Sequence, residues 1–157
     1  MNGHNIATGL SVLLAALMLI AAYSDLRSRT VSNGLNAAIA LLAIPFWMSL
    51  GLPLWPAIAQ QIGVAFVVFA IFAGVFYVGA MGGGDVKMIA ALSLWLPAGL
   101  LLQFIMVMSL VGAALTIMFV TYHKLSKTQL NQGIPYAVAI SAAGIWAVHQ
   151  QYINQFS

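Results

Sequence analysis

The feature that most constrains this chain is a series of long apolar runs that take up most of its 157 residues. Each run approaches the roughly 20 residues that an α-helix needs to cross a bilayer. Glycine, proline and polar residues typical of turns separate them. The runs cover residues 6–23, 35–50, 57–78, 86 to about 101, about 102 to 122, and 135–148. The pattern predicts an all-α, polytopic membrane protein with six transmembrane helices.

Composition excludes the main soluble classes of protein. Only 4% of the residues are charged and 63% are hydrophobic, whereas a soluble domain has about 25% charged residues. A water-facing surface cannot be built from this composition, which excludes a soluble enzyme, a nucleic-acid-binding protein, a coiled coil and a disordered chain. Since no repeat or linker interrupts the runs, we expect a single domain over residues 1–157, embedded in a lipid bilayer.

The positive charges give the expected orientation of the helices. Lys and Arg concentrate in the cytoplasmic loops of membrane proteins. With a helix break near Pro97, six spans place all five cations on one side, whereas five spans would leave Lys124 and Lys127 outside. We therefore predict six spans with both termini outside. The cations are Arg27, Arg29, Lys87, Lys124 and Lys127.

The sequence has only two acidic residues, Asp25 and Asp85. On this topology both lie at the cytoplasmic edge, Asp25 at the end of the first span and Asp85 at the start of the fourth. Each has a structural explanation, because Asp85 is placed to cap the helix that follows it and Asp25 to pair with Arg27 or Arg29. However, ionisable residues at membrane depth are costly and are therefore functional candidates. Two of them on one membrane face favour a catalytic pair.

Such a pair has a defined chemistry. Two carboxyls about 3 Å apart cannot both ionise, so they share one proton. The ionised member can activate a water while the protonated member donates to a carbonyl oxygen, which is peptide hydrolysis without a covalent intermediate. Asp25 lies near the negative end of one helix dipole and Asp85 near the positive end of another. We therefore expect Asp25 to be the acid and Asp85 the base.

Three adjacent glycines, Gly82, Gly83 and Gly84, precede Asp85. Glycine disfavours helix continuation and lets the backbone approach a bound peptide closely. A plain turn between two helices is the alternative, but the adjacent acid favours a substrate-binding backbone.

Other hydrolytic chemistries do not fit the sequence. It has no H-E-x-x-H metal motif and no G-x-S-x-G nucleophile motif. Its three histidines are far apart and it has no cysteine. We expect neither a metal nor another cofactor.

Two segments around the aspartates resemble the type IV prepilin peptidases, which are G-x-G-D membrane aspartyl proteases. Residues 25–33, DLRSRTVSN, resemble that family's D-x-R-x-R-x-(I/V)-P-N signature, and residues 82–88, GGGDVKM, resemble its G-x-G-D-x-K-(L/M) signature. A weaker third element, residues 133–137, resembles the Pro-containing start of the family's last helix. Ser32 stands where the family commonly has Pro.

The resemblance implies a six-helix fold in the cytoplasmic (inner) membrane, with Asp25 and Asp85 catalytic at the cytoplasmic face. It also implies a pilin or pilin-like precursor as substrate, cut between a basic leader and an apolar helix. Arg27, Arg29 and Lys87 are candidate contacts to substrate or lipid. Long members carry a Cys-rich insertion and also N-methylate the product. This chain has neither insertion nor cysteine, so we do not expect the methyltransferase activity. Its short form resembles the peptidase of tight-adherence (Flp) pilus systems or an archaeal preflagellin-type peptidase.

Two other functions remain open from the sequence. Intramembrane acids also mark ion pathways, so a small transporter coupled to protons or cations is one alternative. A presenilin-like protease that cuts within a helix is the other. Transporters place their acids near the midplane, commonly within repeats, whereas both acids here are expected at one edge.

Overall fold

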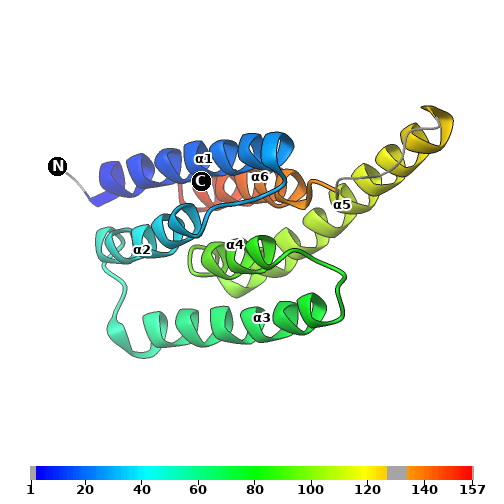
Figure 1. The fold of residues 1–157 in the computed structure, drawn as a ribbon. Helices are drawn as coiled ribbons and strands as arrows, with labels where there is room; N and C mark the ends of the chain where they lie inside the picture. Colours follow the sequence, from blue (N-terminus) through cyan, green and yellow to red (C-terminus); the bar gives the residue numbers. More distant parts are fainter. Residues whose placement is uncertain (1–2, 127–133, 157) are drawn as a thin grey trace.

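The computed structural model describes residues 3–126 and 134–156, which are almost entirely α-helical (Figure 1). The predicted all-α class is confirmed. A short π-helical segment, η1 (Leu54–Ile58), precedes α3. The α-helices are α1 (Gly3–Ser28), α2 (Asn33–Ser49), α3 (Ala59–Tyr77), α4 (Gly83–Ser93), α5 (Ala98–Ser126) and α6 (Tyr136–Phe156).

Four of these helices form a central bundle. α1 packs against α2 and α6, and α4 packs against the same two helices, which closes the ring. α3 lies on the outer side of α4, and α5 packs along α6 and extends past the other helices (Figure 1). Leu14, Met18, Leu92 and Ile140 are fully buried in the core. The outer surface is also apolar, as expected for helices that face lipid.

Three helices are long and apolar enough to cross a membrane, judged over the described residues. They are Gly3–Ser28, Leu54–Tyr77 and Ala98–Tyr122. α2 is apolar but shorter, at 17 residues. A membrane protein is therefore supported, whereas the number of spans stays a prediction.

The fourth predicted helix is much shorter than the sequence indicated. The predicted break near Pro97 is confirmed, but α4 ends at Ser93 rather than near residue 101, and α5 begins at Ala98 rather than near residue 102. With 11 residues, α4 is about 16 Å long, roughly half of a 30 Å hydrocarbon core. In Figure 1 the α4–α5 turn lies well short of the bundle end where α2 is joined to α3.

This early end is stabilised by side chains from other helices. Carbonyls at a helix end lack intrahelical donors and are tolerated at membrane depth only when protein groups satisfy them. The indole of Trp47 donates to the carbonyl of Leu94 at 2.9 Å. The amide of Gln61 donates to the carbonyls of Ser93, at 2.9 Å, and Leu96. The sequence pattern predicted the break but placed the end of α4 too late, because side chains of α2 and α3 supply the hydrogen bonds that allow the early end.

Ser32, the residue that departs from the family signature, has a definite role at the start of α2. It is the N-cap residue, and its side chain accepts a hydrogen bond from the backbone N–H of Leu35 at 3.2 Å. A side-chain cap thus replaces the rigidity of a proline in the loop between α1 and α2.

Ser32→Ala is expected to lower the free energy of unfolding by about 1 kcal/mol, the usual value of an N-cap. Denaturation of the purified protein in detergent measures the change. Ser109→Ala, which removes a hydroxyl from the interior of α5, is the control and should have a smaller effect. Equal unfolding midpoints for Ser32→Ala and the wild type would contradict the capping role.

Candidate active site

Asp25 lies in the last turn of α1 and is buried, with only 5% of its surface exposed. Its Oδ2 accepts a hydrogen bond from the backbone N–H of Ala137 at 2.9 Å. Ala137 is in the first turn of α6, where N–H groups have no acceptor within their own helix. Asp25 therefore connects the end of α1 to the start of α6.

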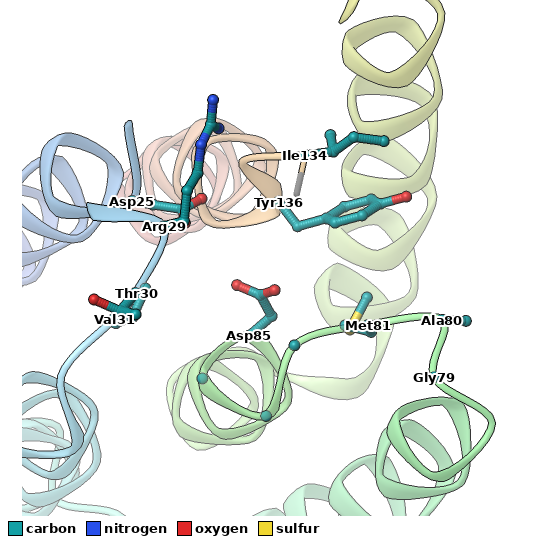
Figure 2. A pocket seen from close by; sticks show the side chains of 13 residues that line it. Asp25, Arg29, Thr30, Val31, Gly79, Ala80, Met81, Asp85, Ile134 and Tyr136 are labelled. Carbon is teal, nitrogen blue, oxygen red and sulfur yellow. The ribbon is translucent and has the colours of Figure 1, made fainter. Parts of the chain in front are cut away.

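Asp85 lies in the first turn of α4, half-buried, and its carboxylate projects from that turn into a pocket (Figure 2). Gly82 is the N-cap residue of α4, with extended backbone angles of −74° and 143°. Gly82 is thus extended, as expected for backbone that interrupts a helix, whereas Gly83 and Gly84 are the first residues of α4 rather than unwound. Asp85 follows them in the first turn of the helix.

At each glycine of the run, a Cβ atom would come close to a different neighbouring group. A Cβ on Gly82 would lie 2.9 Å from Oδ2 of Asp85, so a larger residue would collide with the carboxylate. A Cβ on Gly84 would lie 3.3 Å from the carbonyl oxygen of Val31, in the loop after α1. A Cβ on Gly83 would lie 3.4 Å from the ring of Phe76. The run lets the start of α4 pack between the α1–α2 loop and the end of α3.

The two aspartates line the same pocket, which has a volume of about 530 Å³. Asp25 comes from α1, and Asp85 comes from α4 on the facing wall (Figure 2). Gly82, Gly83 and Gly84 form part of the lining. We name this space the catalytic pocket. It has both carboxyl groups and exposed backbone, which are the parts that peptide hydrolysis by an activated water requires.

Among residues 3–126 and 134–156, no group of three His, Cys, Asp or Glu side chains is close enough to hold a metal ion. The polar side chains that line the described part of the pocket are those of Asp25, Arg29, Thr30, Asp85 and Tyr136.

The pKa of Asp85 is raised from 3.8 to about 6. Burial is the main cause, because it disfavours the charged form. The negative charge of Asp25 raises it further, whereas a hydrogen bond from the backbone of Gly82 lowers it. The effect of Asp25 indicates that the two carboxyls are electrostatically coupled. At pH 7 Asp85 is mostly ionised, as a general base must be.

The raised pKa of Asp85 predicts the acid side of the pH profile. If ionised Asp85 is the base, kcat/KM should fall as the pH drops through about 6, the pKa of Asp85, to about a tenth of its maximum at pH 5. Rates measured between pH 4.5 and 8 on one precursor check this expectation. A rate that stays constant down to pH 4.5 would contradict it.

Comparison with protein families matches residues 12–117 to the type IV leader peptidase family. The match covers most of the chain and includes both aspartates and the glycine run. The chain belongs to the type IV leader peptidase family. No curated protein and no solved structure matches it. The resemblance to prepilin peptidases is thereby confirmed, and membership indicates a protease that acts on pilin precursors.

The two arginines of this leader peptidase have different positions. Arg29 lines the catalytic pocket, and its charge acts on Asp25. Its guanidinium lies 5.3 Å from the centre of the Phe119 ring, and its backbone φ is 54°, which is unusual for a residue other than glycine. Arg27 is exposed, and its Nη1 donates to the hydroxyl of Tyr23 at 3.3 Å. Of the two predicted contacts, Arg29 alone lines the pocket.

Lys87 points away from the catalytic pocket. Its Nζ donates to Oδ1 of Asn33 at 2.8 Å, and Asn36 of α2 donates to the carbonyl of Gly84 at 3.0 Å. Lys87 and Asn33 are the polar ends of the two family motifs, so the contact ties the motifs together. This position favours a role in holding α2 against α4.

Sequence reasoning did not assign Tyr136, Ile134 and Met81 to the site, yet all three line the catalytic pocket. The third motif was the available signal for the first two. Ile134, Tyr136 and Ala137 belong to it, although Gly133 lies outside the described residues. Its role was missed because nothing in the sequence placed the start of α6 beside Asp25.

Proposed function

We propose that this leader peptidase is an aspartic endopeptidase that removes the basic leader from pilin-like precursors at the cytoplasmic boundary of the membrane. One observation carries the proposal: the only two acidic residues in the sequence line one pocket, at one end of the helix bundle. Family membership supports the peptidase activity.

The reaction requires one proton on the aspartate pair. Ionised Asp85 removes a proton from a water, whose oxygen attacks the scissile carbonyl carbon. Protonated Asp25 gives its proton to the carbonyl oxygen, which forms a neutral tetrahedral intermediate. Asp85 then passes its proton to the leaving nitrogen as the C–N bond breaks, and Asp25 recovers its proton as the new carboxyl group forms. The proton belongs formally to the pair.

The assignment of acid and base has support from Asp85, whose pKa of about 6 leaves it ionised at neutral pH. Asp25 also accepts a hydrogen bond from the N–H of Ala137 at the start of α6. This contact was not predicted from the sequence. Asp25 as the resting acid therefore stays a prediction. Infrared difference spectra of Asp25→Asn and Asp85→Asn would test it, since only loss of the acid removes the band of the protonated carboxyl.

The glycine run supplies the backbone for holding the peptide. The N–H groups of Gly83 and Gly84, the first two residues of α4, have no acceptors within the helix, and both glycines lie in the wall of the catalytic pocket. These N–H groups are suited to donate hydrogen bonds to the carbonyls of an extended peptide beside Asp85. Arg29 lines the same pocket and is suited to contact the substrate, whereas the exposed Arg27 is placed to contact lipid headgroups and Lys87 contacts Asn33 instead.

The proposed topology has six membrane-embedded helices, both termini outside and the active site at the cytoplasmic face of the inner membrane. Its support is the distribution of cations, because Arg27, Arg29 and Lys87 lie at the bundle end that contains the catalytic pair. Such clustering is typical of the cytoplasmic side. The absence of cysteine from the sequence further favours a peptidase of the tight-adherence (Flp) type.

The test is cleavage by the purified protein in detergent of a precursor with a basic leader and an apolar helix. Mass spectrometry should find two fragments divided at the boundary, with one ¹⁸O in the new carboxyl group when the reaction runs in H₂¹⁸O. Added hydroxylamine should trap no acyl product. Cleavage inside the apolar helix would indicate a presenilin-like protease. Proton flux in liposomes without any cleavage would indicate a transporter.

A further inference from the structure

A second hollow, which we name the α3–α5 groove, lies beside the catalytic pocket. It has a volume of about 450 Å³. Its walls come from Phe72 of α3, from α5 between Met108 and Ile117, and from Tyr136 and Ile140 of α6. The groove exists because α3 packs mainly against α4 while α5 packs mainly against α6. The outer helices are thereby held apart.

The groove continues directly into the catalytic pocket. Met81 and Tyr136 line both spaces. Figure 2 shows these two side chains between Asp85 and α5. A chain that leaves the pocket past Tyr136 would therefore enter the groove without crossing a helix.

The α5 side of the groove is shaped for close approach of another helix. Ser109, Gly112, Ala113 and Thr116 all line it, and their spacing places them on one face of α5. Gly112 is covered by the ring of Tyr136, since a Cβ there would lie 3.5 Å from it, but Ser109 and Ala113 are exposed. In bilayers, helices associate where such small side chains let their backbones approach.

The charge of the adjoining pocket distinguishes between possible occupants. An acyl chain would fit the apolar groove, but the headgroup of an anionic lipid would then lie beside ionised Asp85, whose charge repels it, although Arg29 lines the same pocket. A precursor has a basic leader followed by an apolar helix. With its boundary at the aspartates, the polar segment lies in the polar pocket and the helix lies against apolar walls.

We propose that the α3–α5 groove holds the first turns of the precursor's apolar helix, which enters sideways from the bilayer and presents its boundary to Asp25 and Asp85. This inference rests on the proposed function. It assigns Ser109, Ala113 and Thr116 to substrate binding, with Tyr136 at the junction between groove and pocket.

Crosslinking tests the proposal directly. Because the sequence has no cysteine, Ala113→Cys introduces a single thiol into the groove. Ala37→Cys is the matched control, since Ala37 is also exposed but lines a different hollow between α2, α3 and α4 that shares no residue with the catalytic pocket. Both variants carry Asp25→Asn so that substrate is retained. The probe is a precursor that the wild type cleaves, with one cysteine in the second turn of its apolar helix.

We expect the yield of the disulfide with Ala113→Cys to be at least about tenfold higher than the yield with Ala37→Cys. Equal crosslinking at both positions, or none at Ala113→Cys, would overturn the inference. If the wild type cleaves no precursor, the proposed function fails instead, so the two failures are distinguishable.

A kinetic comparison separates substrate binding from lipid binding. Ala113→Trp fills the groove and should lower kcat/KM for the full precursor at least about tenfold, mainly by raising KM. Ala37→Trp should leave both parameters near wild type. Melting temperatures of both variants establish that they fold. If lipid added back to the detergent restored full cleavage to Ala113→Trp, the groove would be a lipid site and the inference would be wrong.

Discussion

Asp25→Asn and Asp85→Asn are each expected to lower kcat/KM by at least about a thousandfold, because each variant keeps the shape of the pocket but removes one half of the proton transfer. The amide of the first variant can still accept the hydrogen bond from Ala137. The second variant retains a side chain of the same size at the pocket wall. Cleavage of a pilin-like precursor, measured under single-turnover conditions, gives the ratio to wild type.

The same variants should remain folded, which separates chemistry from stability. The pKa of Asp85 in the folded protein is about 6, above the usual value near 3.9 in an unfolded chain. Proton binding therefore favours the folded state between these values, and stability falls as the pH rises through that window. At pH 7.5, Asp85→Asn should have a melting temperature equal to or above that of wild type. Near-normal cleavage by either variant would refute the two-aspartate mechanism.

Gly82→Ala is expected to lower kcat by about a hundredfold, the cost of displacing a reacting group by roughly 1 Å. The backbone at Gly82 is extended with φ of −74°, which alanine adopts without strain. The cost arises because the new Cβ would lie 2.9 Å from Oδ2 of Asp85 and would push the carboxylate aside. The loss should appear in kcat and in the acid limb of the pH profile.

Gly74→Ala is the matched control, because a Cβ on Gly74 of α3 meets no atom within 4 Å. This variant should cleave the precursor at the wild-type rate. Both alanine variants should melt close to wild type. Equal rates for Gly82→Ala and Gly74→Ala would show that the position of the Asp85 carboxylate does not depend on Gly82.

The sequence predicted a pair of aspartates because their scarcity and their motifs pointed to the same two residues. Asp25 and Asp85 are the only acids, each lies within a long signature, and the structure places both in one pocket. The all-helical fold was equally accessible, since apolar runs of membrane length have few alternatives. Family membership confirms the assignment to prepilin peptidases.

Contacts between helices were beyond the reach of sequence patterns. Lys87 was predicted to contact substrate or lipid, but its Nζ donates to Asn33, 54 positions away. The sequence prediction placed the end of α4 too far along the chain. Nothing in the local sequence indicates that Gln61 and Trp47, which belong to other helices, satisfy the carbonyls of the turn. Ala137 reaches Asp25 across 112 positions. Such long-range hydrogen bonds become visible only when the helices are packed.

The shortness of α4 also determines the level at which the Asp85 carboxylate is held. Its first turn is fixed to α2 through Asn36 and Lys87, and its last turn is fixed through Trp47 and Gln61. A rod of about 16 Å clamped at both ends cannot slide, so the Asp85 carboxylate stays at one depth. Under the proposed function, this fixed position sets where the cut falls, at the boundary between a substrate's polar segment and its apolar helix.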